Sequence, residues 1–432
     1  MRGYKLKISS IFLLFALCFS VNLNAQSKFV TVKDGQFVND NKPYTFVGTN
    51  YWYGSLLALK GDEGKIRLKK ELDFLRKNGV INLRLMLGAE GESDYKYRVA
   101  NEDALQPKKG VFRDAVLYGL DYLLSEVAKR DMKVVLHFTN TWEWSGGLGE
   151  YLEWNGHGKQ PLPKNPDYSW DIYRDYISQF YTCDACKANL QKYIKHILAH
   201  TNTINNVKYV DDSSIMAWEI INEPRPMRPK AMDAFQQWMS ETAALIKSID
   251  KNHLLTTGSE GEIAMDNNTD EFVKLHADKN IDYITIHLWP KNWGWFKGDS
   301  IATSFDNIIN NADEYIKKHV KIAEELNKPL VIEEFGLPRN KMYFDINSST
   351  SYRDRFYTKV FEFAENNKII AGTNFWSFGG LARPIPGQVF WKHGDDYMGD
   401  PGGEEQGLNS VFTSDKSTWK IIKTHAKKID KR

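Results

Sequence analysis

The sequence of 432 residues contains only three cysteines and carries almost no net charge. Its 57 Lys and Arg residues nearly balance its 55 Asp and Glu residues, so the formal net charge is +2. Proteins that bind nucleic acid neutralise phosphates with an excess of basic residues, and we therefore expect no nucleic-acid partner. The scarcity of cysteine excludes a disulfide-rich scaffold, and a zinc site built on cysteine pairs would need a second pair.

Long apolar runs are also missing, except for one short run near the N-terminus. A basic start, MRGYKLK, precedes this run, and small and polar residues surround Ala25. The pattern predicts a secretory signal over residues 1–25 and one mature domain over residues 26–432, with no membrane span. A retained anchor is the alternative, whereas a lipoprotein is disfavoured because Leu17 stands where a small residue should precede Cys18. We expect a secreted protein, whether periplasmic, cell-surface or extracellular.

Removal of the signal leaves one cysteine pair, Cys183 and Cys186, in the stretch YTCDACKANL. A C-x-x-C pair can be a redox motif, half of a zinc site or a local disulfide, and an oxidising compartment favours the disulfide. We expect a short-range structural disulfide or paired thiols here.

Apolar strand-like runs alternate with amphipathic helix-like stretches along the mature chain. Eight such runs occur, at residues 44–50, 80–87, 132–138, 214–223, 253–260, 281–289, 329–336 and 371–378. Alternation of this kind favours a parallel sheet, and eight repeats favour closure into a (β/α)₈ TIM barrel in a single α/β domain. A doubly wound open sheet is the alternative, but its glycine-rich phosphate turn is missing after the first run.

Three segments extend beyond this alternation. The lead-in FVTVKDGQFVNDNKPYTF alternates apolar residues around Asp34 and Gly35, which predicts an N-terminal β-hairpin that plugs the bottom of the barrel. Extra length at residues 142–185 and 379–412 follows the third and eighth strands. Long loops after strands shape the catalytic face of such barrels.

Polar and aromatic side chains gather at the predicted strand ends, where a barrel of this kind directs them into one site. They are Asn50, Arg84, His137, Asn140, Asn222, Glu223, His287, Trp289, Glu333, Glu334 and Trp376. Glu223 and Glu334, on the fourth and seventh strands, would face each other. Two opposed carboxylates are what glycoside hydrolysis needs, one protonated to release the leaving oxygen and one ionised to attack. The acid needs a raised pKa, and Arg84 is the candidate partner that keeps Glu334 charged with a low pKa.

Three stretches, WEIINEPR, HLWP and IEEFG, occur in the order and spacing of a known family. They resemble the signatures of glycoside hydrolase family 5. The sequences around these stretches, KYVDDSSIMAWEIINEPR and IDKNHLLTTGSEG, resemble the β-mannanases of that family more than its cellulases. The resemblance extends from about Phe29 to the last helix, and it implies a retaining mechanism that uses neither a cofactor nor a metal.

The resemblance also implies roles for individual residues. Glu223 would be the acid/base and Glu334 the nucleophile. Asn222 would hydrogen-bond the 2-hydroxyl of the reacting sugar, His287 would join the acid/base network, and Trp376 would form the floor under that sugar.

Trp289 departs from the family pattern, because many relatives carry a Tyr two positions after the His. A Trp has no hydroxyl with which to hydrogen-bond the nucleophile, so we expect Trp289 to stack on the substrate instead. Asn50, Trp52, Asn140 and Trp142 complete the expected substrate-binding set.

Two further glutamates compete for the catalytic roles. Strand side chains alternate, so only one of Glu333 and Glu334 can point up the barrel axis, and family matching selects Glu334. Glu219 lies on the same side of its strand as Glu223 but one layer deeper. We expect it to pair with a basic side chain such as Arg84.

The sequence is rich in aromatic residues, at 13%, and several tryptophans fall in loops after strands. Flat aromatic faces stack on pyranose rings while polar neighbours bind the hydroxyls. We favour substrate binding over core packing for this loop group, which comprises Trp52, Trp142, Trp144, Trp289, Trp293 and Trp295. Three tryptophans on strand or helix patterns are expected in the core: Trp218, Trp238 and Trp419.

An acidic stretch near the C-terminus, HGDDYMGDPGGEEQG, offers hard oxygen ligands for calcium. We favour a solvated acidic loop and expect no metal. The stretch TGSEG does not have the spacing of a serine nucleophile elbow, which argues against serine hydrolase chemistry.

These features together predict a secreted, monomeric, retaining endo-β-1,4-mannanase that acts on mannan, glucomannan or galactomannan without a cofactor. A β-1,4-glucanase or xyloglucanase on the same barrel is the nearest alternative, because mannose and glucose differ only at the 2-hydroxyl. Exo action is a second alternative, if the long loops wall off one end of the cleft. A non-catalytic glycan-binding protein fits the aromatic loops equally well but has no need of a carboxylate pair.

Overall fold

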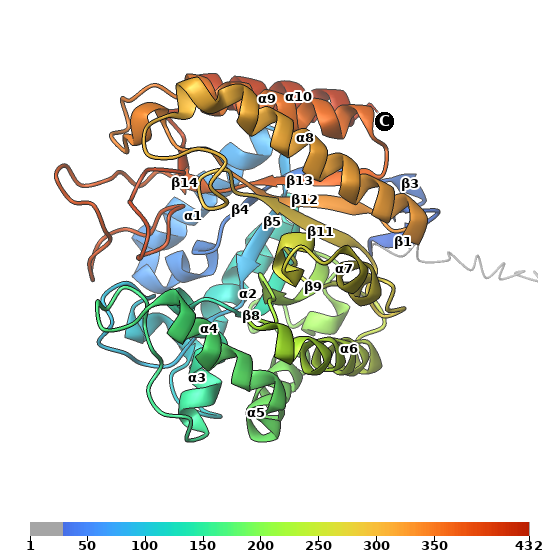
Figure 1. Cartoon of the computed structure of the whole chain (residues 1–432), viewed down its shortest axis with the longest axis vertical. Helices are drawn as coiled ribbons and strands as arrows, with labels where there is room; N and C mark the ends of the chain where they lie inside the picture. Colours follow the sequence, from blue (N-terminus) through green and yellow to red (C-terminus); the bar gives the residue numbers. More distant parts are fainter. Residues whose placement is uncertain (1–28, 432) are drawn as a thin grey trace, which may run out of the picture.

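The computed structural model describes residues 29–431, so the predicted signal at residues 1–25 lies outside the described residues. Eight parallel strands form one central sheet, and helices surround it (Figure 1). In chain order the strands are β4 (Phe46–Asn50), β5 (Val80–Met86), β8 (Lys133–Asn140), β9 (Ile215–Asn222), β10 (Leu254–Thr256), β11 (Ile284–Leu288), β12 (Leu330–Phe335) and β13 (Ile370–Phe375). Each overlaps its predicted run, and the predicted (β/α)₈ barrel is confirmed.

The sheet runs β10-β9-β8-β5-β4-β13-β12-β11, so its two ends are consecutive along the chain. Main-chain hydrogen bonds join these ends: Asp282 donates to Leu255 at 2.8 Å, and His287 donates to Glu260 at 3.0 Å. These bonds bring the segment after β10 against β11 and complete the barrel.

Helices cover the outside of the barrel. They are α1 (Gly61–Lys77), α2 (Asp114–Ala128), α3 (Gly147–Trp154), α4 (Trp170–Ser178), α5 (Asp184–Leu198), α6 (Met232–Ile249), α7 (Thr269–His276), α8 (Ile301–Leu326), α9 (Ser351–Asn366) and α10 (Lys416–Ile429). Shorter strands pair outside the barrel: β6 (Ala89–Glu90) with β7 (Ala104–Gln106), and β14 (Phe378–Gly380) with β15 (Val411–Phe412).

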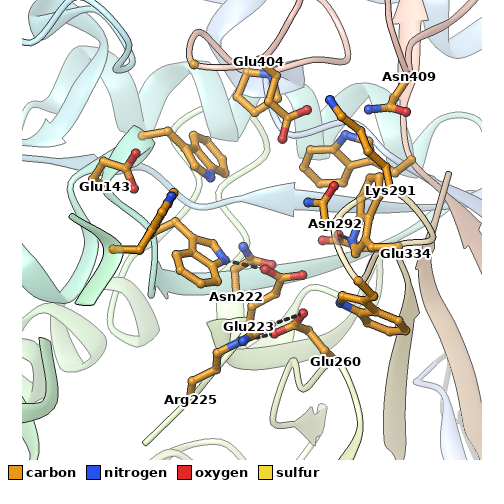
Figure 2. Close-up of a pocket in the computed structure, with 18 of the residues that line it drawn as sticks. Glu143, Asn222, Glu223, Arg225, Glu260, Lys291, Asn292, Glu334, Glu404 and Asn409 are labelled. Atoms are coloured by element: carbon orange, nitrogen blue, oxygen red, sulfur yellow. Dashed lines mark hydrogen bonds and ion pairs between the residues drawn. The ribbon is translucent and has the colours of Figure 1, made fainter. Parts of the chain in front are cut away.

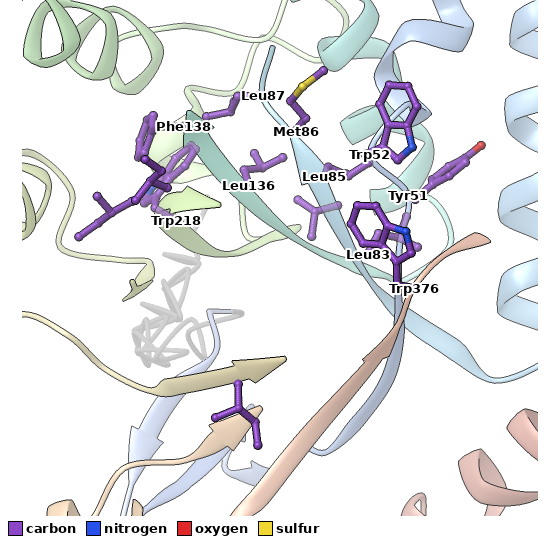
Figure 3. Close-up of a cluster of buried hydrophobic side chains, with 14 of the residues drawn as sticks. Tyr51, Trp52, Leu83, Leu85, Met86, Leu87, Leu136, Phe138, Trp218 and Trp376 are labelled. Atoms are coloured by element: carbon purple, nitrogen blue, oxygen red, sulfur yellow. The ribbon is translucent and has the colours of Figure 1, made fainter. Parts of the chain in front are cut away.

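Side-chain alternation on the strands separates the core from the site. On β5, Leu83 and Leu85 are fully buried in the hydrophobic cluster beneath the helices, and Arg84 between them turns into the barrel. On β9, Trp218 packs on Phe138 with ring centroids 5.3 Å apart (Figure 3), as expected for a core tryptophan. Strands such as β5 and β9 are buried on both faces, which explains why their sequences are nearly continuous apolar runs.

The predicted hairpin forms three short antiparallel strands, β1 (Thr31–Lys33), β2 (Gln36–Asn39) and β3 (Lys42–Pro43). Phe37 on β2 packs on Phe46, at the start of β4, and on Tyr283, with centroid distances of 6.3 and 5.2 Å. The hairpin therefore closes the N-terminal end of the barrel, opposite the strand ends that carry the polar side chains.

The loop after β13, residues 379–412, packs across the loops that follow β4 and β5. The indole Nε1 of Trp52 donates to the carbonyl of Gly399 at 2.9 Å, and the hydroxyl of Tyr397 donates to Asp103 at 2.9 Å. Trp52 is only 2% exposed, so it anchors this loop and does not present its ring to solvent.

Asp400 corrects the prediction of a solvated acidic loop. Its carboxylate is 1% exposed and accepts main-chain hydrogen bonds from Gly407 at 2.8 Å and from Asn409 and Ser410 at 3.1 Å. The acidic stretch is thus folded around one buried carboxylate.

The expected disulfide is present between Cys183 and Cys186, at the start of α5. No helix among residues 29–431 has the length and apolar character needed to cross a membrane.

Candidate active site

A cavity of about 640 Å³ opens at the C-terminal ends of the barrel strands (Figure 2), within the usual size range of small-molecule sites. Its walls combine aromatic rings with charged and amide side chains. The lining residues are Trp142, Glu143, Trp144, Lys164, Trp170, Arg174, Asn222, Glu223, Arg225, Glu260, Ile263, Trp289, Lys291, Asn292, Trp293, Glu334, Trp376, Pro401, Gly403, Glu404, Glu405 and Asn409.

Glu223 follows β9 directly and has a φ of 53°, in the left-handed region that few glutamates adopt. Its main-chain N–H donates to Gly258 at 3.0 Å, which holds the turn in place. The side chain points into the cavity. Its Oε2 accepts a hydrogen bond from Nε1 of Trp142, and its Oε1 lies 2.7 Å from Nδ1 of His287. A strained backbone persists where its surroundings fix it, as they do here.

Glu334 lies on β12, on the opposite side of the cavity. Its Oε1 forms an ion pair with Nη1 of Arg84, and its Oε2 accepts a hydrogen bond from Nε1 of Trp289 at 3.0 Å. The neighbouring Glu333 points below the cavity, where it lies 3.5 Å from both Arg84 and His287. Alternation along the strand therefore brings Glu334, and not Glu333, to the cavity, as predicted.

Arg84 connects both sides of the site from beneath. Its Nη2 and Nε bond the carboxylate of Glu219 at 2.6 and 2.8 Å, which confirms the predicted pairing of Glu219. The same guanidinium donates to Oδ1 of Asn222 at 2.7 Å and to Oδ1 of Asn50 at 3.0 Å. A planar guanidinium carries five N–H donors and can therefore bond several acceptor oxygens at once.

Burial dominates the electrostatics of the site. It raises the pKa of Glu223, opposed by the charge of Arg225 and the hydrogen bond from Trp142. It also raises the pKa of Glu334 well above its usual value, and the Arg84 charge opposes this rise. The predicted low pKa for Glu334 is therefore wrong, because desolvation outweighs the ion pair. Two close carboxylates repel each other, and only Glu334 forms an ion pair with Arg84.

The sequence-predicted residues fall into two groups. Asn222, Glu223, Glu334 and three tryptophans line the cavity, the tryptophans being Trp142, Trp289 and Trp376. The others lie behind its wall: Asn50, Trp52, Arg84, Asn140 and His287. Arg84 pairs with Glu334 and His287 contacts Glu223, the contacts expected of them. We expected Asn50, Trp52 and Asn140 to contact substrate, but each is at most 2% exposed and already bonded to the protein.

Trp289 differs most from expectation. We expected stacking and no hydrogen bond to the nucleophile, but the indole N–H of Trp289 supplies that bond to Glu334. Its ring meets Trp376 edge to face, with centroids 5.8 Å apart. The sequence carried no signal for this, since the contact depends on the side-chain rotamer.

Several lining residues were missed by the sequence interpretation. Arg225 and Glu260 form a bidentate ion pair at 2.5 and 2.7 Å beside Glu223, and the Arg225 guanidinium lies 5.4 Å from the ring centroid of Trp142. Glu260 ends the predicted fifth strand, so its position was a usable signal. Trp170 and Glu404 sit within the two long loops, whose positions depend on distant contacts.

Among residues 29–431, two groups of side chains bring metal-ligand atoms together. Ligand atoms of Glu223, His287 and Glu334 lie within 4.8 Å of one another, but Arg84 places a fixed positive charge against Glu334 and opposes a cation there. In the second group, His157 meets Cys183 and Cys186, whose sulfurs are joined to each other and are not thiolates.

Comparisons with known proteins agree with this geometry. A family model described as GH family 5 beta-mannosidase-like matches residues 27–432. Mannan endo-1,4-beta-mannosidase 5 of Solanum lycopersicum is 27% identical over 405 residues, covering 87% of this chain and 89% of that protein. Mannan endo-1,4-beta-mannosidase 1 of Oryza sativa subsp. japonica is 28% identical over 420 residues, covering 93% of this chain and 86% of that protein.

Among solved structures, a glycoside hydrolase family 5 mannosidase from Rhizomucor miehei, in complex with mannosyl-fructose, is similar over 94% of this chain and 98% of its own. The TM-score is 0.85 and the sequence identity 29%. The family model covers nearly the whole chain. This protein is therefore a glycoside hydrolase and belongs to family 5, in its β-mannosidase-like group.

Proposed function

We propose that this chain is a retaining endo-β-1,4-mannanase that cleaves β-1,4-mannosidic bonds of mannan, glucomannan or galactomannan. The observation that carries the proposal is the closeness of Glu223 and Glu334, whose oxygens approach within 4.8 Å across the cavity. Retaining glycosidases hold their two carboxyl groups about 5–5.5 Å apart, whereas inverting enzymes hold them about 6.5–9.5 Å apart. The tomato and rice relatives are both named mannan endo-1,4-beta-mannosidases, which supports mannan as the polysaccharide.

In this mechanism Glu334 attacks the anomeric carbon while Glu223 gives its proton to the departing oxygen. Water then gives a proton to Glu223, attacks the same carbon and releases Glu334. Burial raises the pKa of Glu223, which favours the protonated form that an acid needs. Burial also raises the pKa of Glu334, but the ion pair with Arg84 opposes that rise and favours the ionised form that a nucleophile needs. Glu223 as the proton carrier and Glu334 as the nucleophile are sufficient for both steps.

Asn222 and Trp376 are the proposed contacts of the reacting sugar. The Asn222 amide is oriented by two bonds, since its Oδ1 accepts from Arg84 at 2.7 Å and its Nδ2 donates to Asn140 at 3.0 Å. The second N–H of Nδ2 is then available to a sugar hydroxyl. The ring of Trp376 lines the cavity next to Glu334 and offers an apolar face to the pyranose.

Reducing-sugar release from mannan, glucomannan, carboxymethylcellulose and xyloglucan, measured side by side, tests the substrate. We expect release from the first two only, and release mainly from the last two would favour the glucanase alternative. Glu334→Ala should abolish turnover while oligosaccharide binding remains measurable. A wild-type protein that binds β-mannan but hydrolyses none of the four polysaccharides would be a binding protein.

A second candidate function is exo action, and the loop of residues 379–412 favours it. This loop packs over the loops after β4 and β5 through Trp52 and Tyr397. Its Phe390 lies 4.7 Å from Nζ of Lys164, in the loop after β8. Its Glu405 lies 3.6 Å from Lys291, in the loop after β11. Five residues of this loop, Pro401, Gly403, Glu404, Glu405 and Asn409, line the cavity, so the loop forms part of its wall.

Mannohexaose separates the two modes. An endo enzyme yields several products at once, whereas an exo enzyme releases one short product from the start. A mannohexaose blocked at its non-reducing end should remain a substrate only for the endo enzyme.

We also propose that residues 1–25 direct export and that the mature enzyme works as a monomer. The basic start and short apolar run support export. N-terminal sequencing of the protein recovered outside the cytoplasm should begin near residue 26. Light scattering should give the mass of one chain.

A further inference from the structure

The two oxygens of Glu334 are held by different kinds of donor. Oε1 meets the guanidinium of Arg84, which also bonds Glu219 and Asn222. Oε2 accepts the indole N–H of Trp289 at 3.0 Å. The ion pair fixes one end of the carboxylate. The other end receives the indole hydrogen bond and lies 3.4 Å from Nδ1 of His287.

The Trp289 ring is locked in the orientation that makes this bond. The side chain is 8% exposed and meets Trp376 edge to face. On its other side lies Gly336, where an added Cβ would stand 3.0 Å from Cζ3 of Trp289 and 3.1 Å from the carbonyl of Trp376. Glycine at position 336 leaves the room that the indole occupies. The main-chain carbonyl of Trp289 accepts from Trp293 at 2.9 Å, which anchors the backbone.

An indole N–H differs chemically from a tyrosine hydroxyl. It donates only, and it neither accepts a hydrogen bond nor titrates in water. A phenol can donate, accept and lose its proton. The bond from Trp289 therefore has the same polarity at every working pH, and it always stabilises the ionised form of Glu334.

We propose that Trp289 is a positioning residue for the nucleophile, which fixes Oε2 of Glu334 through a donor that cannot titrate and so sets the acid limb of the pH profile. This inference rests on the proposed role of Glu334. In the first step the donor orients the carboxylate for attack. In the second step water forms the new bond to the anomeric carbon and gives a proton to Glu223. The electron pair of the broken ester bond returns to Glu334, whose Oε2 again accepts the hydrogen bond from Trp289.

The other charged and titratable groups that face Glu334 are Arg84 on β5, Glu223 after β9, His287 on β11 and Glu333 on its own strand. Burial lowers the pKa of His287, which favours the neutral ring. Arg84 is charged throughout. The acid limb of kcat/KM therefore reports the carboxylates themselves, and a lost donor to Glu334 must move it.

The test compares the wild-type enzyme with Trp289→Phe, Trp289→Tyr and the control Trp238→Phe, which removes a buried indole from the helical layer. Two readouts are followed across pH: kcat/KM on mannohexaose, and the rate at which a 2-deoxy-2-fluoro-mannosyl fluoride labels Glu334, located by mass spectrometry. Thermal unfolding identifies any variant that fails to fold.

For Trp289→Phe we expect a fall of about 10- to 100-fold in kcat/KM, the usual effect of losing a hydrogen bond to a charged group. Its acid limb should move up by about one pH unit, because the ionised carboxylate loses a donor. The Tyr variant, which keeps a donor, should regain part of the lost kcat/KM and part of the shift in the acid limb. Trp238→Phe should keep the wild-type acid limb.

A folded Trp289→Phe enzyme with an unmoved acid limb would overturn the positioning role while leaving the proposed function intact, provided that wild-type Glu334 is labelled. Labelling of wild type at another residue would overturn both. If Trp289→Phe does not fold, Trp289→Met, which also lacks the donor, carries the test, and an acid limb identical to wild type together with unchanged labelling across pH would count against the proposal.

Discussion

The indole Nε1 of Trp142 donates a hydrogen bond to Oε2 of Glu223. Across the cavity, Trp289 makes the same bond to Glu334. Each carboxylate therefore receives one indole N–H, but only Glu334 also forms an ion pair with Arg84. Unlike surroundings for two similar side chains are what an acid and a nucleophile require.

Trp142→Phe should change the basic limb of the pH profile. Activity falls as pH rises through the pKa of the acid, because Glu223 then loses the proton it must donate. The N–H of Trp142 lowers that pKa, so its removal should move the basic limb of kcat/KM up by about one pH unit. Trp170→Phe, a neighbouring indole with no bond to Glu223, is the matched control. A downward shift, or an equal shift in both variants, would contradict this account.

Arg84→Met should destabilise the fold as well as stop catalysis. It leaves the buried carboxylates of Glu219 and Glu334 without their cation, and breaking a buried ion pair costs about 3–5 kcal/mol. Urea unfolding measures the loss. Arg84→Met combined with Glu219→Gln removes one of the stranded charges and should recover part of the stability but none of the activity. Full stability in the single variant would contradict the pairing.

Asp400→Asn should loosen the loop of residues 379–412. The amide puts an NH₂ group where Asp400 now accepts hydrogen bonds from the N–H groups of Gly407, Asn409 and Ser410. A buried donor left facing another donor costs about 2 kcal/mol. Hydrogen exchange should show faster exchange in this loop, and Asp396→Asn, at an exposed neighbour, should leave exchange unchanged. Equal exchange in both variants would speak against a buried anchor.

Loss of the Cys183–Cys186 disulfide should have a small effect. The bond closes a loop with a sequence separation of only 3 residues, and short loops gain about 2 kcal/mol or less from closure. Serine at both positions should lower the melting temperature slightly and leave kcat/KM unchanged. A large loss of activity in this variant would mean that the disulfide supports the cavity.

The barrel could be predicted from sequence because strands buried on both faces read as apolar runs, and eight of them alternate with helices. The convergence of Glu223 and Glu334 followed from their places at strand ends. The donor role of Trp289 could not be predicted, because it depends on a rotamer fixed by Gly336 and Trp376.

The pKa of Glu334 was mispredicted for a different reason. The sequence pattern identified the charged partner, Arg84, but gave no measure of how completely the site is desolvated. The positions of the long loops also depend on distant contacts, such as the bond from Trp52 to Gly399, that no local pattern encodes.

The plug formed by β1–β3 has a practical consequence for orientation. Phe37 seals the end of the barrel farthest from Glu223 and Glu334, and the described chain begins beside this seal at Phe29. A tether or solid support joined ahead of Phe29 would attach to the N-terminal end of the barrel. The cavity with Glu223 and Glu334 would then face away from the support, toward polymers in the surrounding medium.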